Sequence, residues 1–151
     1  MPLIPVSVIV LTRNEAANLG PCLAALESFG QVAVVDSDSG DGTPAIAAAR
    51  GIPVIPFRWS GTYPKKKQWS LDHVKLRYPW VLLIDADECL TPALTAEIAA
   101  LMGAPGGPPR AGYFIRGRPV FLGRPLRFGL HNLKLALFDR RRARFPEVPD
   151  L

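Results

Sequence analysis

Two carboxylates, Asp85 and Asp87, directly follow residues 80–84, an apolar run of strand length. The run predicts a buried strand, and side chains two residues apart on a strand lie on one face, so both carboxylates are expected to enter one site. They would repel each other unless a cation lay between them. Oxygen ligands indicate a hard divalent ion, which completes its coordination with water and with phosphate oxygens of a substrate.

The same acidic residues have a second interpretation, as the start of a helix. Thr91 followed by Pro92 is typical of a helix N-terminus, and acidic residues nearby, such as Asp87 and Glu88, would be stabilised by the helix dipole. On this motif alone the metal site and the solvated helix start both remain open, because short motifs often match by chance.

A chain of 151 residues, 48% of them hydrophobic, fits one folded domain and excludes a disordered tail or a fibrous protein. Charges or prolines interrupt every apolar run before it reaches the length of a membrane span, and residues 1–5 predict no secretory leader. Cys22 and Cys89 have no metal-type spacing and give no disulfide framework. We therefore expect a cytoplasmic protein, with the inner face of the cell membrane as a peripheral location.

Charge is distributed asymmetrically along the chain, although the net charge is only +5. Residues 1–109 carry 8 basic and 10 acidic side chains, whereas residues 110–144 carry 10 basic side chains and one acid, Asp139. Such a segment attracts nucleic acid, anionic lipid or a phosphorylated substrate, or is simply a solvated face. Aromatic residues within it are expected to be buried, which argues against a free tail: Phe114, Phe121, Phe128 and Phe138.

Strands and helices are predicted to alternate through the first hundred residues. Apolar runs predict strands at 6–11, 32–35, 52–57 and 80–84, the third at a sheet edge because of its prolines. Helical spacing predicts helices at 17–28, closed by Gly30, at 43–50 and at 91–102, and a further helix within residues 63–78. Shorter strands of hairpin character are predicted at 112–116, 119–122 and 133–139. This order is typical of an α/β fold with a doubly wound, mostly parallel sheet and a mixed C-terminal strand region.

Polar clusters follow three of the predicted strands, at residues 12–15, 36–41 and 85–88. Ligands bind at the carboxyl ends of the strands in open parallel sheets. Because parallel strands bring these ends to the same edge, we expect the three clusters to form one site.

Three segments resemble the family-2 inverting glycosyltransferases with the GT-A fold: residues 6–15 (VSVIVLTRNE), 34–43 (VVDSDSGDGT) and 82–87 (LLIDAD). Their order and spacing match the family, and together they cover the first hundred residues. The region is also similar to members that extend lipopolysaccharide core or other lipid-linked glycans. The resemblance implies transfer of a sugar from a UDP-sugar, with inversion and with Mn²⁺ or Mg²⁺, to an envelope glycan or lipid-linked acceptor.

The resemblance also implies roles for individual residues. Asp36, which we favour for its place at the strand end, or Asp38 would read the base. Asp85 would face the ribose or the metal, and Asp87 would hold the divalent cation that bridges the diphosphate and neutralises its charge as it departs. The nucleoside pocket would be lined by the residues after the first strand: Thr12, Arg13, Asn14 and Glu15.

Three consecutive lysines, Lys65, Lys66 and Lys67, precede the carboxylate strand and offer cations to the diphosphate, with Lys67 favoured. The alternative is an exposed helix start, although lysines there oppose the helix dipole. His131 lies where acceptor-side residues are expected. The glycine motifs of dehydrogenases and ATPases are absent, as is the serine elbow of hydrolases.

An inverting transfer needs a general base for the acceptor hydroxyl, and the resemblance places that carboxylate after the metal motif. Asp139, Glu147 and Asp150 are the candidates, the first expected to be held in ion pairs, so the catalytic base stays unassigned. Family members are usually longer, so we expect a truncated chain. Residues 1–109 would form a donor-binding subdomain and residues 110–151 a basic acceptor-side region of the same domain.

Two other functions remain as alternatives. A sugar-nucleotidyltransferase has a similar nucleotide-binding sheet but normally a glycine-rich loop after its first strand, which residues 12–15 lack. A non-catalytic module would use the basic segment to bind polyanions or membrane. The expected partners are a UDP-sugar, a glycan or lipid-linked acceptor and an anionic membrane surface. Nucleic acid is not expected, because no nucleic-acid-binding motif accompanies the basic residues.

Overall fold

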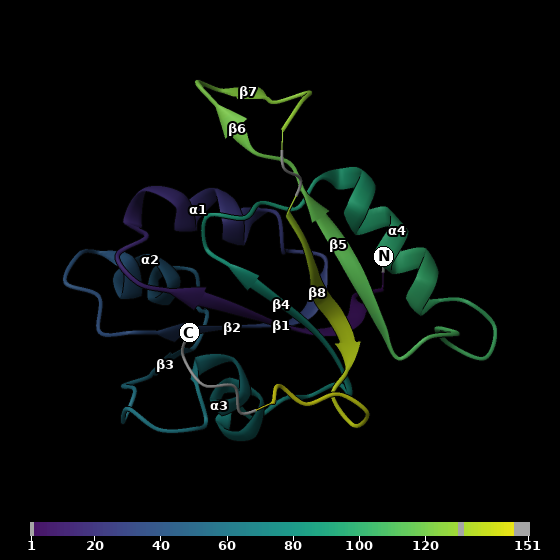
Figure 1. Cartoon of the computed structure of the whole chain (residues 1–151), viewed down its shortest axis with the longest axis horizontal. Helices are drawn as coiled ribbons and strands as arrows, with labels where there is room; N and C mark the ends of the chain where they lie inside the picture. The colour runs from purple at the N-terminus through teal and green to yellow at the C-terminus, as the bar shows by residue number, and fades with distance from the viewer. Residues whose placement is uncertain (1, 130–131, 147–151) are drawn as a thin grey trace.

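A computed structural model describes residues 2–129 and 132–146 of the chain, which form a central sheet with helices on both faces (Figure 1). The main sheet has six strands in the order β3-β2-β1-β4-β8-β5. Its parallel half consists of β1 (Ile4–Thr12), β2 (Phe29–Asp36), β3 (Val54–Pro56) and β4 (Trp80–Asp85). The crossovers carry α1 (Ala16–Ala24), α2 (Thr43–Ala49) and α3 (Lys66–His73). The predicted α/β sheet is confirmed, with β3 at its edge.

The register of the parallel strands aligns their carboxyl ends. Thr12 lies opposite Asp36 on β2, and Leu11 lies opposite Asp85 on β4. The polar clusters that follow these strands therefore share one edge of the sheet, as predicted.

The last third of the chain completes the sheet with antiparallel strands. After α4 (Pro92–Met102), β5 (Gly112–Gly117) forms the edge, and β8 (Asn132–Asp139) lies between β5 and β4, antiparallel to both. A separate hairpin of β6 (Val120–Phe121) and β7 (Arg124–Pro125) connects them and stands away from the body of the molecule (Figure 1). Because β8 is antiparallel to β4, β8 begins at the side of the sheet where the carboxyl end of β4 lies.

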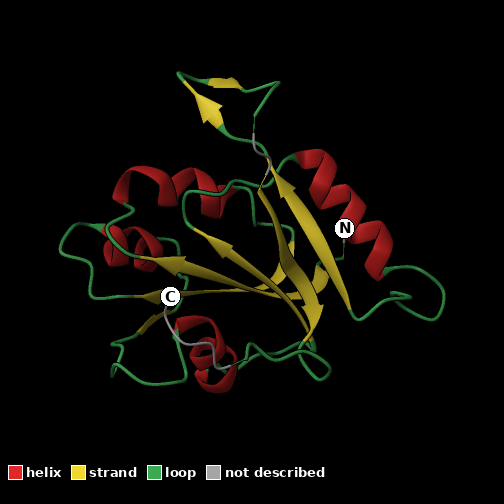
Figure 2. Cartoon of the chain, viewed as in Figure 1, coloured by secondary structure: helices red, strands yellow, loops and turns green. Residues whose placement is uncertain are grey.

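Two apolar cores lie on opposite faces of the sheet. On β1 the side chains of Val6, Val8 and Val10 enter one core, with residues of α1, α2 and α4. Ile9 and Leu11 enter the other core, with residues of α3. This alternation explains why the strands read as continuous apolar runs, since both faces are covered by helices (Figure 2). In the described part of the chain, no helix has the length and apolar character to cross a membrane.

The end of the first helix differs from the prediction. Helix α1 ends at Ala24, and Gly30 lies within β2 instead of closing the helix. A Cβ atom at position 30 would lie 2.5 Å from the Tyr78 hydroxyl oxygen and 2.6–2.8 Å from two carbons of its ring. A larger residue at position 30 would therefore displace the Tyr78 side chain, a contact between distant segments that helical periodicity does not reveal.

The aromatic residues of the basic segment also differ from the prediction. Phe138 is buried on β8, but Phe114 and Phe121 are each 64% exposed and Phe128 is 89% exposed. The expectation of burial is wrong for these three because Phe121 and Phe128 belong to the projecting hairpin region and Phe114 lies on the exposed face of the edge strand β5.

Candidate functional site

A hydrogen-bond network fixes the ends of β1 and β2. Thr12 Oγ1 donates to Asp36 Oδ1 at 2.6 Å, and Ser39 donates to the same carboxylate through Oγ at 2.6 Å and through its backbone N–H at 2.9 Å. Burial raises the pKa of the Asp36 carboxyl, but the hydrogen bonds from Ser39 and Thr12 outweigh burial and hold that pKa below its ordinary value. Asp36 is therefore a buried carboxylate that orders the loop after β2.

The loop after β1 docks on the loop after β2. The Asn14 N–H donates to Ser39 Oγ and the Asn14 side chain accepts from the Gly40 N–H, both at 2.8 Å. The Glu15 N–H donates to Thr43 Oγ1 at 2.9 Å. Asn14 has φ +53°, a left-handed conformation that asparagine adopts more readily than most residues. Both loops are thus held in one arrangement at the sheet edge.

An open cleft of about 650 Å³ lies beside these strand ends. Cationic side chains dominate its polar lining, and Asp38 is its one carboxylate, paired with Arg58 at 3.4 Å. Phe57 and Trp59 add aromatic surface, and Trp59 is positioned by a 2.8 Å hydrogen bond to the carbonyl of Thr62. The lining residues are Arg13, Ser37, Asp38, Phe57, Arg58, Trp59, Lys65 and Lys66.

Lys66 connects the cleft to the strand ends. Its Nζ donates to the carbonyl oxygen of Thr12 at 2.7 Å. Burial lowers the pKa of Lys66 to about 8, although the charges of Asp36 and Asp85 oppose this shift. Lys67 lies elsewhere, with Nζ 5.7 Å from the ring centroid of Phe145. The structure thus brings Lys66 to the site rather than Lys67.

The acidic cluster after β4 holds a lysine from β8. Lys134 Nζ lies 2.7 Å from Glu88 Oε2 and 3.4 Å from Asp85 Oδ2, and Glu88 also accepts from the Asp85 N–H at 3.2 Å. Asp87 is exposed in the turn that follows the strand. The expectation that Asp85 and Asp87 share a strand face is wrong, because β4 ends at Asp85 and a turn begins there, closed by the Glu88 N–H donating to the Asp85 carbonyl.

The acidic cluster does not form the start of helix α4, which was its alternative interpretation. Helix α4 is capped by Thr91, whose side chain accepts from the Leu94 N–H at 3.1 Å, and Pro92 is its first residue. No acidic residue lies in its first turn. The carboxylates of Asp85, Asp87 and Glu88 are therefore not needed to begin α4.

A divalent cation would find hard oxygen ligands in this cluster, since the carboxylates of Asp85 and Glu88 already converge on one ammonium group. Within residues 2–129 and 132–146, no group of three or more His, Cys, Asp or Glu side chains is arranged to hold a metal ion. Mg²⁺ is commonly held by one or two carboxylates and completes its coordination with water and substrate phosphates. The residues fit an ion of that kind.

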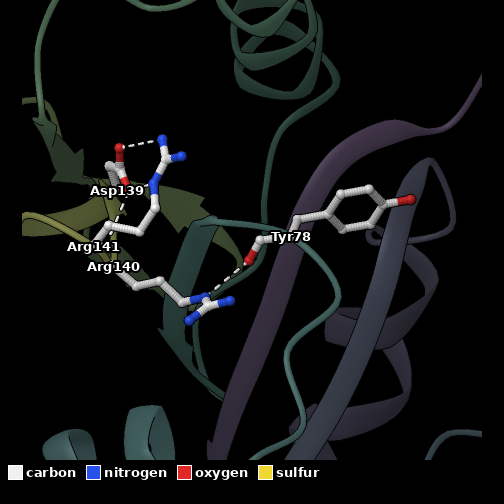
Figure 3. A network of polar contacts seen from close by, with 4 residues as sticks. All are labelled: Tyr78, Asp139, Arg140 and Arg141. Atoms are coloured by element: carbon white, nitrogen blue, oxygen red, sulfur yellow. Dashed lines mark hydrogen bonds and ion pairs between the residues drawn. The ribbon is translucent and has the colours of Figure 1, made fainter.

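Asp139 lies on β8, beside the start of β4 rather than beside its carboxyl end. It pairs with Trp80, the first residue of β4, whereas Asp85 is the last. Arg141 binds both carboxylate oxygens, at 2.9 and 2.7 Å, and Arg140 donates to the Tyr78 carbonyl at 3.1 Å (Figure 3). The hydrogen bond from Arg141 lowers the pKa of the Asp139 carboxyl. The expected ion pairing is confirmed, and Asp139 is not near the cleft.

The other acceptor-side candidates, His131, Glu147 and Asp150, lie outside the described residues. Conversely, the structure adds residues that the motifs did not single out. Phe57, Arg58 and Trp59 follow β3, and their place after a parallel strand is the signal that could have found them. Lys134 lacks such a signal, because its role depends on the antiparallel placement of β8 beside β4.

Comparison with solved structures supports the GT-A fold predicted from the sequence. Residues covering 68% of this chain superpose on 32% of S. aureus TarS with a TM-score of 0.53 and 26% identity. A glucosyl-3-phosphoglycerate synthase from Mycobacterium tuberculosis, crystallised with Mg²⁺ and UDP, superposes with a TM-score of 0.51 and 22% identity over 67% of this chain and 40% of that one. The sheet and its flanking helices thus have the architecture of GT-A glycosyltransferases.

Sequence relatives agree with the fold. The lipopolysaccharide core biosynthesis glycosyltransferase LpsC of Rhizobium meliloti (strain 1021) is 34% identical over 128 residues, which are 82% of this chain and 46% of that protein. An uncharacterized glycosyltransferase of Rickettsia felis is 37% identical over 62% of this chain and 32% of its own length. The chain thus spans less than half of these relatives. A family model, Glycosyl transferase family 2, matches residues 7–150, and the chain belongs to that family.

Proposed function

We propose that this chain contains the donor-binding part of a glycosyltransferase that uses a UDP-sugar and a divalent cation, Mn²⁺ or Mg²⁺. The cleft beside the strand ends carries this proposal. It combines four cationic side chains, two aromatic rings and one carboxylate, the chemistry that a nucleoside diphosphate requires. A mycobacterial synthase of the same fold was crystallised with UDP and Mg²⁺, which supports the choice of ligand.

The base of the nucleotide fits the outer part of the cleft. Uracil carries one N–H donor between two carbonyl acceptors and a flat face. Asp38 offers a carboxylate that accepts an N–H, Arg13 and Arg58 offer donors, and Phe57 and Trp59 offer surfaces on which a base stacks. Asp36 would act indirectly, because its oxygens already accept hydrogen bonds from Thr12 and Ser39.

The diphosphate fits between Lys66 and the acidic cluster. Lys66 would pair with phosphate oxygens, and Asp85, with Asp87 or Glu88, would hold the cation. Such an ion stabilises the charge that gathers on the diphosphate as the sugar leaves. Thr12, Asn14 and Glu15 would support this arrangement through the docked loops rather than through the ligand.

Transfer with inversion would follow from attack on the anomeric carbon by an acceptor hydroxyl. A bond forms between the hydroxyl oxygen and that carbon, the bond to the diphosphate oxygen breaks, and UDP leaves with the electron pair. The hydroxyl proton passes to a general base. Asp139 suits that role poorly, because Arg141 binds both of its carboxylate oxygens and it lies opposite the first residue of β4 rather than near Asp85. The general base stays unassigned.

The acceptor would be an envelope glycan or a lipid-linked glycan, as the likeness to the LpsC protein suggests. In this arrangement residues 1–109 bind the donor and residues 110–151 face the acceptor. The basic side chains of the second region suit an anionic acceptor or the anionic surface of a membrane.

Nucleotide binding tests the proposal more directly than transfer, because the chain lacks an assigned base. We expect UDP with Mn²⁺ to raise the melting temperature, and ADP or GDP to raise it less, since a ligand stabilises the folded state that binds it. Lys66→Met should abolish the shift, and Lys67→Met, the matched control, should preserve it. Equal shifts for all nucleotides, or an unchanged shift in Lys66→Met, would contradict the proposal.

A further inference from the structure

We propose that the projecting hairpin, residues 118–128, inserts its apolar tip into an anionic membrane surface. We call these residues the hairpin arm. The inference deepens the proposed function, since it names the surface at which a lipid-linked acceptor would be met. It also stands on observations of its own, which concern exposure, backbone conformation, charge and position.

Exposed apolar side chains gather on this arm. Most of the large hydrophobic residues that are exposed in the described part of the chain lie between residues 114 and 133. Leu122 and Phe128 are almost fully exposed, at 87% and 89%. Such a concentration on a folded domain marks a surface that contacts a partner or a membrane. The arm members are Val120, Phe121, Leu122, Leu126 and Phe128.

The turn at the tip contains an apolar residue that local structure disfavours. Leu122 and Gly123 join β6 to β7 with φ values of +49° and +75°. Two-residue hairpin turns with both φ values positive favour Asn-Gly or Asp-Gly, because most side chains are strained there. Neither the turn nor burial within this chain accounts for leucine at position 122. Contact with an apolar phase outside the chain does.

The charge of the hairpin arm indicates that the surface it binds is anionic. Arg118, Arg124 and Arg127 belong to the arm, and no Asp or Glu occurs from residue 98 to residue 138. Basic side chains around an apolar tip are the combination by which interfacial segments bind anionic bilayers. A second copy of the chain is a less suitable partner for the arm, because two such arms would bring like charges together. Nucleic acid would satisfy the arginines but leave the aliphatic tip in water.

The position of the arm relates it to the donor site. The arm follows β5 and precedes β8, and β8 begins at the sheet edge where β4 ends. Lys134, near the start of β8, contacts Asp85 at that edge. An arm anchored in a bilayer would therefore keep the donor cleft, which lies at the same side of the sheet, close to the membrane surface.

Vesicle flotation tests the inference. We expect the protein to float with vesicles of equal parts phosphatidylcholine and phosphatidylglycerol, and not with phosphatidylcholine alone. Leu122→Asn combined with Phe128→Ser should reduce binding at least about tenfold, without loss of fold, since both side chains are exposed. Leu3→Ser removes an exposed apolar side chain before β1 and is the matched control, with unchanged binding. Arg124→Gln combined with Arg127→Gln should abolish the preference for anionic vesicles.

Insertion has a separate readout. In Phe121→Trp, the added tryptophan should shift its emission to the blue on vesicle binding and be quenched by brominated acyl chains, relative to the unsubstituted protein. Undiminished binding of the Leu122→Asn, Phe128→Ser protein would overturn the inference, leaving only electrostatic adsorption. Self-association of the unsubstituted protein that this double variant abolishes would also overturn the inference, because the arm would then bind a second copy of the chain. A UDP-induced rise in melting temperature that survives in every arm variant separates failure here from failure of the proposed donor site.

Discussion

Asp36 and Asp38 are two residues apart in sequence, yet their surroundings give them different tasks. Asp36 is buried and accepts hydrogen bonds from Thr12 and Ser39, whereas Asp38 lines the cleft and pairs with Arg58. The sequence favoured Asp36 as the base-reading carboxylate because it ends a strand. A residue at a strand end can serve either the fold or the ligand, and only the hydrogen bonds distinguish the two.

Substitution separates these two tasks. Asp38→Asn should weaken UDP binding about tenfold and leave the melting temperature unchanged, because the side chain is exposed and its loss removes one ligand contact. Asp36→Asn should lower the free energy of unfolding by about 1–3 kcal/mol, since buried hydrogen bonds to the carboxylate are lost. Calorimetric titration with UDP and chemical denaturation measure the two effects. The reverse pattern would return the base-reading role to Asp36.

The pKa of Lys66 predicts a pH dependence of nucleotide binding. In the free protein this pKa lies near 8, lowered by burial. A bound diphosphate favours the charged ammonium and raises the pKa, so binding takes up a proton and affinity falls as the pH rises through about 8. Titrations of UDP between about pH 7 and pH 9, in buffers of different ionisation enthalpy, measure both effects. Lys66→Arg should remove them, and a pH-independent affinity in the unsubstituted protein would contradict this role.

Lys134 predicts a competition between a side chain and the metal ion. Its ammonium group lies between Asp85 and Glu88, the carboxylates offered to a cation. Lys134→Met should raise the affinity for Mn²⁺ about three- to fivefold, because a partly exposed ion pair is worth up to about 1 kcal/mol. Electron paramagnetic resonance of free Mn²⁺ measures this without nucleotide, and Lys67→Met is the control. An unchanged affinity would show that Mn²⁺ does not use these oxygens.

At the scale of elements, the sequence predicted the parallel half of the sheet closely. Strands buried on both faces are strongly patterned, and β1, β2 and β4 lie within two or three residues of their expected bounds. Helix ends were harder to place, since Gly30 serves packing against Tyr78 rather than capping. Among the three lysines at 65–67 the sequence favoured Lys67, but Lys65 and Lys66 line the cleft, because the position of each residue around α3 decides which side chain faces the site. The strand at 119–122 was predicted with hairpin character, but the exposure of the hairpin was missed because burial was assumed for the phenylalanines of the basic segment.

Helix α4 provides a test of why the acidic cluster exists. Thr91→Ala removes the N-cap hydrogen bond to Leu94 and should lower the free energy of unfolding by about 1 kcal/mol. Asp87→Asn should change it by less than about 0.5 kcal/mol, because no acid lies in the first turn of α4. Denaturation by urea compares the two variants. A loss in Asp87→Asn equal to that in Thr91→Ala would favour the helix-start interpretation instead.

At the scale of the whole molecule, the sheet brings distant segments to one edge. The loops after β1, β2, β3 and β4 meet there, and β8, in the antiparallel half, adds the ammonium group of Lys134. The charge asymmetry of the sequence reappears in the structure, with the cleft formed by the first part of the chain and the basic, partly apolar arm formed by the second. The chain spans less than half the length of the curated relatives it matches.

The central claim is that loops from separate strands form one site for the diphosphate of a sugar donor. A crystal structure with UDP and Mn²⁺ tests it most directly. We expect the base beside Asp38 and Trp59, the diphosphate near Lys66, and the metal ion bound to Asp85. UDP bound at another face, or a metal ion held away from β4, would contradict the account.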